Sequence, residues 1–350
     1  MLKLNWQEIA LEEQYPITSS LYIERVPDES QCYKAILQPG SLIQIKAPQQ
    51  MGKTWLVERI IHQVENMDYR QLLFDFKLGD STVFSNIHKF SQWFCAGVAH
   101  QLGLPNKLAD YWQDMLSCNY NSTVYFQEYL LAQNTSPLVL VLEQVNKVFE
   151  HPQIATDFCQ LLRSWHEQAR RGDRTSKTWQ RLRLVVVHST DVYASLNINH
   201  SPLNNVGTVV ELQEFSPKQV QDLAQRHELI WDATKVKQLM GMVGGHPHLV
   251  NLALNYIARQ NITLEQLLKS AATEAGIYSD HLRCHLKKIK QHPELATALR
   301  EVVTTPKPVR LESVQAFKLY SMGLVKQSGN YATPGCDLYR QYFRERLSFL

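Results

Sequence analysis

Residues 47–54 (APQQMGKT) include the residue types with which a protein holds a polyphosphate. The segment lies between a short apolar run and an amphipathic stretch, which predict a strand before it and a helix after it. In that context the backbone N–H groups of the loop and helix N-terminus face an anion, and the helix dipole favours negative charge. Gly52 would let the backbone pass close to the phosphates, Lys53 would reach the β- and γ-phosphates, and the Thr54 hydroxyl would coordinate Mg²⁺.

The first position of this loop departs from the usual pattern, because Ala47 stands where Gly is typical. If that position requires a positive φ, alanine costs about 1 kcal/mol, which a protein tolerates. A bare Gly-Lys-Thr also occurs by chance. An ordinary strand–turn–helix is therefore the alternative to a phosphate-binding loop.

A second candidate lies at the end of the apolar run 138–142 (LVLVL), which predicts a strand buried on both faces. The next residue, Glu143, offers the carboxylate that must sit beside the metal. Gln144 follows where a water-activating Glu is usual, and its amide cannot accept a proton. Since losing a general base costs about 10²- to 10⁴-fold in rate, we expect binding with slow or absent hydrolysis. The alternative is a core strand with a solvated acid at its end.

Two further places could bring side chains to the phosphates. The run 182–190 predicts another buried strand, and if it neighbours the strand before the loop, Ser189 would lie near the γ-phosphate. A simple strand end is an equally consistent interpretation. His246 and Pro247 follow a Gly-Gly pair at a predicted helix start, so the histidine could point at a nucleotide or merely cap the helix. The histidines and cysteines show no metal-ligand spacing.

The order of the predicted elements indicates how these residues are positioned. Strands alternate with helices over 41–213, which predicts an α/β domain of the P-loop NTPase type with a doubly wound parallel sheet. Residues 214–280 read as helices and predict a helical lid. A helix, a hairpin around Ser-Gly-Asn and a closing helix predict a winged helix over 281–350, and residues 1–40 form a mixed N-terminal segment.

Composition bounds the class of protein. The chain has 350 residues, 44 % apolar and 20 % charged, which supports a sizeable core and excludes wholesale disorder. No apolar run is long enough to span a membrane, and the acidic N-terminal stretch lacks the apolar core of a secretory signal. Six cysteines without a Cys-x-x-Cys pair are expected to be reduced thiols. We therefore expect a cytoplasmic protein without a membrane segment.

Charge is concentrated in the C-terminal part of the chain. Residues 283–350 hold 12 Lys/Arg and 5 Asp/Glu, a net +7 within a total of +3, so the preceding residues carry −4. A basic winged helix could lie on DNA. Acids are interleaved with the basic residues, however, and aromatic residues gather in the closing helix. These features favour a protein partner over DNA.

With these residues in view, the chain resembles the AAA-like ATPase domain common in cyanobacteria, a relative of the STAND class of signal-transducing ATPases, from about residue 22 to 343. YIERVPDE (22–29) resembles the segment that lies against adenine in that class, with Glu24 and Arg25 at its centre. QQMGKTWL (49–56) resembles the family's phosphate-binding loop. The resemblance extends the candidate nucleotide contacts to Gln49, Gln50, Met51 and Trp55.

Other segments of the chain also resemble this family. GGHPHLVNLAL resembles the Gly-x-Pro segment with which STAND proteins sense the phosphate, which places His246 and Pro247 in the site. AFKLYSMGLV and DLYRQYFRERL resemble the family's winged helix. The chain departs at three acidic positions, where it has Glu143, Gln144 and Asn146. The departure affects the hydrolytic site and leaves the phosphate-binding loop intact.

The resemblance implies a nucleotide-gated helper in signalling or defence that uses ATP or ADP with Mg²⁺. Only about 20 residues precede the resemblance, so we expect action through a partner protein or a homo-oligomer. In this hypothesis the nucleotide clamps the lid through Lys53, Thr54 and His246. The alternatives are an active oligomeric ATPase, with water oriented by Gln144 and a base from a neighbouring subunit, and a DNA-binding regulator that uses the winged helix.

Overall fold

The computed structural model describes residues 20–133, 135–196 and 203–348. The first half of the N-terminal segment expected over 1–40 lies outside the described residues. The second half contains helix α2 (Val26–Ile36), which the sequence did not predict. This helix begins with Pro27 in its first turn, where a missing N–H costs no hydrogen bond.

The main sheet has five parallel strands in the order β2-β3-β4-β1-β5. The strands are β1 (Leu42–Ala47), β2 (Arg70–Asp75), β3 (Leu138–Glu143), β4 (Leu182–Ser189) and β5 (Thr208–Glu211). Every apolar run that predicts a strand forms one, and β4 neighbours β1, the condition set for Ser189 to lie near the phosphates. Because all strands run the same way, their carboxyl ends meet at one edge, where Ala47 lies opposite Ser189 and Asp75 opposite Glu143.

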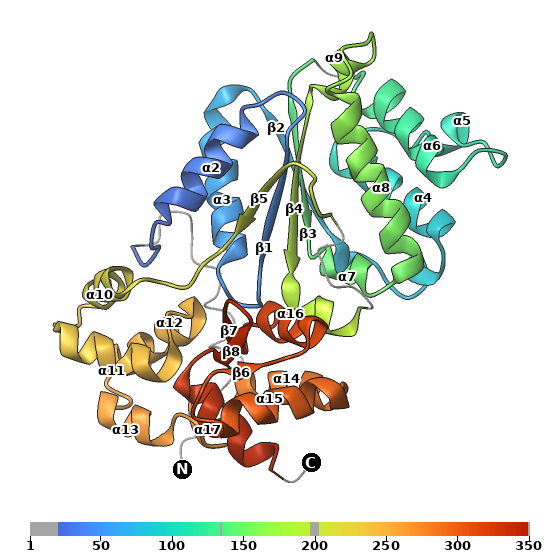
Figure 1. Cartoon of the computed structure of the whole chain (residues 1–350). Coiled ribbons are helices and arrows are strands. Elements are labelled where there is room, and N and C mark those ends of the chain that lie inside the picture. Colours follow the sequence, from blue (N-terminus) through green and yellow to red (C-terminus); the bar gives the residue numbers. More distant parts are fainter. Residues whose placement is uncertain (1–19, 134, 197–202, 349–350) are drawn as a thin grey trace, which may run out of the picture.

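Helices cover both faces of this sheet, which confirms the doubly wound arrangement (Figure 1). One face packs α2 and α3 (Lys53–Val64) against β-strand side chains such as Ile43, Ile45 and Val185. The other face packs α4 (Ile87–Gln101) and α8 (Pro152–Gln168) against Leu184 and Val186, and α6 (Cys118–Val124) lies against these two helices. Alternate residues of β1 and β4 thus enter different cores, as a strand buried on both faces requires.

Short helical turns complete this part of the chain. They are η2 (Glu65–Met67), η3 (Phe76–Leu78), η4 (Val83–Ser85), α5 (Leu108–Tyr111), the π-helix η5 (Tyr125–Leu130), α7 (Asn146–Phe149), α9 (Ser176–Trp179) and η6 (Thr190–Ser195).

After β5 the chain forms a helical segment and a C-terminal unit. The helical segment contains α10 (Pro217–Arg226), α11 (Ala233–Val243), α12 (Pro247–Ala258) and α13 (Leu264–Ser270). The C-terminal unit contains α14 (Ser279–Lys290), α15 (Pro293–Thr304), β6 (Val309–Arg310), α16 (Ser313–Ser321), β7 (Val325–Ser328), β8 (Tyr331–Pro334) and α17 (Asp337–Arg346). Its three strands form an antiparallel sheet in the order β6-β8-β7. Both parts share one continuous core.

The C-terminal unit lies against the carboxyl edge of the main sheet (Figure 1). The Thr190 hydroxyl, directly after β4, donates to the carbonyl of Ser321 at 2.6 Å. Phe317 of α16 stacks on Tyr193 of η6, with ring centroids 5.6 Å apart. The edge that carries the candidate chemistry is therefore covered by a unit from the far end of the sequence.

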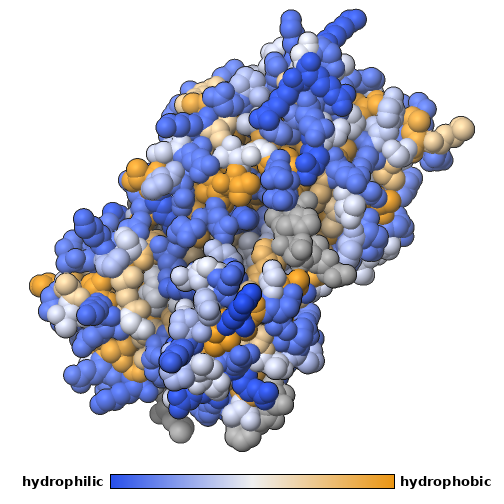
Figure 2. Space-filling view, viewed as in Figure 1, coloured by the Kyte–Doolittle hydropathy of each residue, from blue (hydrophilic) through white to orange (hydrophobic). Residues whose placement is uncertain are grey.

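The surface in Figure 2 mixes polar and apolar residues, with polar residues predominating on the face shown. Across the described ranges, no helix combines the length and apolar character needed to cross a membrane. All six cysteines are free thiols, as the sequence predicts, and three of them are buried.

Candidate functional site

The predicted loop joins the end of β1 to the start of α3, which is the geometry an anion-binding loop requires. Gln50 and Gly52 take left-handed backbone conformations, with φ of 60° and 88°. Such residues turn successive N–H groups toward a common centre, where they can bind an anion. Ala47 is the last residue of β1 and is extended, so the strain considered for position 47 does not arise there. The non-glycine residue with positive φ is instead Gln50.

Lys53 closes the loop into a ring. Its ammonium donates to the carbonyls of Ala47 at 3.1 Å and Pro48 at 2.7 Å. An ammonium has three donors, so a further one is available for a phosphate oxygen. Burial lowers the pKa of Lys53 to about 8; Asp191 opposes this shift, while the cations of Arg25 and Lys288 reinforce it.

Arg25 reaches the same loop from the N-terminal segment. Its Nη2 donates to the Met51 carbonyl at 2.7 Å, and its guanidinium lies over the Phe215 ring, 5.0 Å from the centroid. Nη1 is buried and has no hydrogen-bond partner in the described part of the chain. A buried donor without an acceptor is unusual, and an anionic ligand beside the loop would satisfy it.

Glu24 and Trp55, two further predicted nucleotide contacts, pair with other parts of the chain. The Glu24 carboxylate lies 3.7 Å from Nη2 of Arg59, and the Glu24 carbonyl accepts from Gln219 of α10 at 2.9 Å. Trp55 stacks on Tyr22, with centroids 5.7 Å apart. These contacts fix the N-terminal segment between α3 and α10. Arg25 is therefore the residue of this segment that contacts the loop.

Asp191 is a site residue that the sequence interpretation missed. Its Oδ1 accepts from the Gln49 backbone N–H at 2.8 Å and from the Ser189 hydroxyl at 2.9 Å, and its Oδ2 accepts from Lys288 at 2.9 Å. Burial alone would raise the pKa of Asp191, but His285 and the ion pair with Lys288 more than offset this, and the pKa is lowered. The only signal in the sequence was an acid two residues beyond a buried strand. The Ser189 hydroxyl thus helps to hold the Asp191 carboxylate in position.

Glu143 ends β3 on the same edge of the sheet as the loop. One of its carboxylate oxygens, Oε1, is buried without a hydrogen-bond partner among the described residues. Burial raises the pKa of Glu143, and the neighbouring carboxylates of Asp75 and Glu58 add to that effect while Lys77 opposes it. A carboxylate in this state would gain from a nearby hydrated cation. Glu143 and the exposed Thr54 hydroxyl fit a Mg²⁺ that keeps most of its waters.

Gln144 has a left-handed backbone, with φ of 58°. A non-glycine residue in this region is uncommon, and such strain often marks functional positions. The next turn is anchored by Asn146, whose Oδ1 accepts from the Ser189 N–H at 3.3 Å. Asn146 therefore ties the ends of β3 and β4 together, a structural role at a position where the resembled family has an acid.

His246 lies at the N-cap position of α12, where its side chain makes no capping hydrogen bond, and belongs to a cluster of buried imidazoles. Its ring lies edge-on to His281, with centroids 5.3 Å apart, and His281 in turn is hydrogen-bonded to Gln50 of the loop at 2.9 Å. Burial lowers the pKa of His246 to about 3, with help from His248 and His285, so the ring is neutral at neutral pH. His246 reaches the loop through His281 in this arrangement.

The Gly-Gly pair before His246 docks closely on the segment after β5. The Phe215 N–H donates to the Gly245 carbonyl at 2.7 Å. A Cβ on Gly245 would lie 2.1 Å from the Phe215 carbonyl oxygen, which no side chain permits. Pro247 is the first helical residue of α12, where proline's fixed φ suits the helix start. The pair thus sets how α12 approaches the loop.

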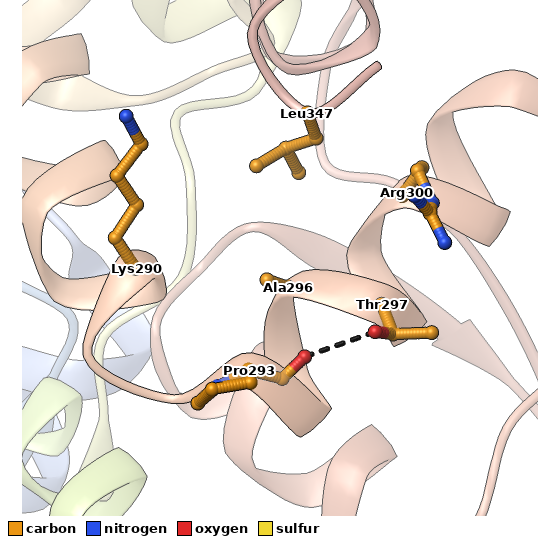
Figure 3. A pocket seen from close by; sticks show the side chains of 6 residues that line it. All are labelled: Lys290, Pro293, Ala296, Thr297, Arg300 and Leu347. Atoms are coloured by element: carbon orange, nitrogen blue, oxygen red, sulfur yellow. Dashed lines mark hydrogen bonds between the residues drawn. The ribbon is translucent and has the colours of Figure 1, made fainter. Parts of the chain in front are cut away.

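Metal-ligand clusters and pockets elsewhere in the described residues do not add to this site. Within residues 20–133, 135–196 and 203–348, no group of three or more His, Cys, Asp or Glu side chains could hold a metal ion by itself. A small pocket of about 150 Å³ lies within the C-terminal unit (Figure 3). It is lined by Lys290, Pro293, Ala296, Thr297, Arg300 and Leu347, none of which is a predicted site residue.

The fold is that of a P-loop nucleoside triphosphatase. Its parallel sheet has the order β2-β3-β4-β1-β5, and a Gly-Lys-Thr loop, held by the hydrogen bonds of Lys53, joins β1 to α3. More narrowly, the chain belongs to the AAA-like domain family, whose model matches residues 10–345. This confirms the AAA-like part of the resemblance. The STAND relation and the cyanobacterial type stay predictions.

Two solved structures are similar over nearly their whole length. A Walker-type ATPase of Pyrococcus abyssi has a TM-score of 0.62 at 12 % identity, covering 92 % of this chain and 96 % of that one. The ORC2 protein of Aeropyrum pernix, solved as ADPNP and ADP complexes, has a TM-score of 0.51 at 13 % identity, covering 95 % and 98 %. At such identities the likeness concerns the fold. No curated protein matches the chain.

Proposed function

We propose that the chain binds ATP or ADP with Mg²⁺ and acts as a regulatory switch that hydrolyses nucleotide weakly or not at all. The observation that carries this proposal is the ring that Lys53 closes on Ala47 and Pro48, at the N-terminus of a 12-residue helix. Backbone donors of residues 49–54, the Lys53 ammonium and the helix dipole would bind the phosphates. Thr54 and Glu143 would hold the metal, which supplies charge neutralisation at the phosphates when bound.

Weak hydrolysis follows from the groups at the end of β3. Gln144 stands where a carboxylate would take a proton from the attacking water, and an amide can only orient that water. The alternative of an active oligomeric ATPase needs a base from another subunit. Phosphate release from the purified chain distinguishes the two functions.

The switch itself would use the contacts between the loop and the C-terminal unit. Gln50 binds His281, and Asp191 binds both Gln49 and Lys288, so occupancy of the loop is coupled to α14. Partner proteins would bind the helical segment or the C-terminal unit, the predicted lid and winged helix. Such coupling requires only that the nucleotide bind the two arrangements with different affinity.

A DNA-binding regulator remains the second candidate because of the net +7 over 283–350. Against it, α16, the helix before the β7–β8 hairpin, packs on η6 through Phe317 and Tyr193 and is half-buried there. DNA binding through α16 would need this interface to open. Salt-dependent DNA binding lost on neutralising Arg310 and Lys318 would support this candidate; no binding at low salt would remove it.

The proposed nucleotide site is tested by fluorescence titration with a labelled adenine nucleotide and Mg²⁺. We expect saturable binding that Lys53→Ala weakens by about 10- to 100-fold, because a charge-assisted phosphate contact is lost. Lys89→Ala, at an exposed position on α4, is the matched control and should bind normally. Wild-type protein without saturable binding would refute the proposal.

Mass analysis of nucleotide released from the denatured protein would show which nucleotide the resting protein holds. Bound ADP would indicate slow turnover or a switch that rests in its ADP state, whereas bound ATP would indicate a chain unable to hydrolyse it.

A further inference from the structure

Lys288 of α14 brings a positive charge from the C-terminal unit to Asp191, the acid that binds the loop backbone. Its Nζ lies 2.9 Å from Asp191 Oδ2, and the other oxygen of the same carboxylate accepts from the Gln49 N–H at 2.8 Å. The carboxylate is almost fully buried, with 3 % of its side chain exposed, while 31 % of the Lys288 side chain is exposed. The Asp191 carboxylate therefore connects the Lys288 ammonium to the loop backbone through two hydrogen bonds.

The charges around the loop are unbalanced without a ligand. Lys53, Arg25 and Lys288 lie close enough to interact electrostatically; Asp191 is the acid beside Lys53 and Lys288, while Asp28 and Glu29 lie beside Arg25. A single carboxylate cannot neutralise both lysines. An additional anion near Lys288 would therefore be stabilised, and a terminal phosphate supplies such a charge where ADP does not.

A second group on α14 faces the same place. His285 lies one helical turn before Lys288, so both side chains lie on the same face of the helix. The His285 ring is buried, with 5 % of the residue exposed, and its Nδ1 has no hydrogen-bond partner in the described ranges. His285 is close enough to Asp191 and Lys288 for a charge on any one of them to affect the others. The unpaired nitrogen of a neutral imidazole can donate to a phosphate oxygen beside the partly exposed ammonium of Lys288.

We propose that Lys288, supported by His285, binds the terminal phosphate of ATP and lets this chain distinguish ATP from ADP. With ADP, Lys288 stays paired with Asp191; with ATP, it turns to the phosphate, which a flexible lysine stem permits. The inference rests on the proposed nucleotide site and adds to it a specificity-determining residue from the C-terminal unit. A structural ion pair without this role is the competing explanation.

The test compares the affinities of the full-length chain for AMPPNP and for ADP, each with Mg²⁺, by competition against a labelled nucleotide. Lys288→Gln should weaken AMPPNP binding by about 10-fold or more and change ADP binding by less than about twofold. Lys287→Gln, at the exposed neighbouring position on α14, should change neither. Equal losses for both nucleotides, or no loss for either, would overturn the proposal.

Asp191→Asn provides an independent variant if Lys288→Gln fails to fold. The asparagine oxygen can still accept from the Gln49 N–H, but Lys288 loses its charged partner and becomes free for the phosphate. The preference for AMPPNP over ADP should then rise several-fold; an unchanged or smaller preference contradicts the proposal. Wild-type protein that binds neither nucleotide would instead refute the nucleotide site itself.

Discussion

Gln50 of the phosphate-binding loop and His281 of α14 are hydrogen-bonded at 2.9 Å although 231 residues separate them. Because the Gln50 oxygen can only accept, Nδ1 of His281 carries the proton, and Nε2 accepts from the Tyr339 hydroxyl at 2.8 Å. This pattern requires a neutral imidazole, and burial keeps the pKa of His281 well below its usual value. The loop is thereby linked to α14 and α17.

Acid should destabilise the protein through these buried imidazoles. Burial lowers the pKa of His285 to about 4, with Asp191 opposing the shift and Lys288 adding to it. The unfolded chain therefore takes up a proton near pH 6.5 before the folded one does, and stability falls as the pH drops from about 6.5 toward 4, by up to about 3 kcal/mol for this group. Thermal melts across that range measure the loss.

His285→Gln should reduce this pH dependence, whereas His100→Gln, at an exposed position on α4, should leave it unchanged. Identical pH slopes for wild type and His285→Gln would contradict the prediction.

Nucleotide affinity should fall above pH 8. The free protein loses the Lys53 charge as the pH rises through about 8, and binding must then restore the proton. The apparent affinity would drop by up to about 10-fold per pH unit. Titrations between pH 7 and 9.5 check this, with Lys53→Arg as the comparison, because a guanidinium stays charged throughout. A flat wild-type profile would show that the Lys53 charge does not control binding.

Gln144→Glu should raise phosphate release, because it returns a proton acceptor to the end of β3. A general base contributes about 10²- to 10⁴-fold, and the gain should vanish when Lys53→Ala is added. A steady-state phosphate assay measures both. If the wild type already turns over rapidly and Gln144→Glu adds nothing, the active-oligomer alternative is correct.

Gly245→Ala should lower the free energy of unfolding, because the contact that positions α12 near the loop leaves no room for a Cβ. Its Cβ would lie 2.1 Å from the Phe215 carbonyl, so the backbone must shift, at a cost of about 1–3 kcal/mol or more. Gly241→Ala is the matched control: its Cβ meets nothing within 4 Å in α11, and helix propensity predicts a gain of about 0.5–1 kcal/mol. Thermal or denaturant unfolding measures both, and equal stability of the two variants would refute the packing argument.

Much of the fold could be predicted because the signals are local. The apolar runs at 42–45, 138–142 and 182–190 form β1, β3 and β4, since only the centre of a parallel sheet buries both faces of such runs. Ser216 caps α10 and Pro217 is its first residue, a helix-start signal that acts within one turn of the chain. The two-residue β6 and the short turns lack such signals. Their formation depends on packing partners that are distant in the sequence.

The sequence by itself determined the loop, its lysine and threonine, and the acid and amide that end β3, because these residues are adjacent to the strands that position them. The tertiary structure alone decided that Asp191 holds Gln49, that Lys288 pairs with Asp191, and that an imidazole reaches Gln50. The Lys288 and His281 contacts join segments 97 and 231 residues apart. No local pattern specifies which surface the C-terminal unit covers, because that choice depends on the summed packing of two folded surfaces.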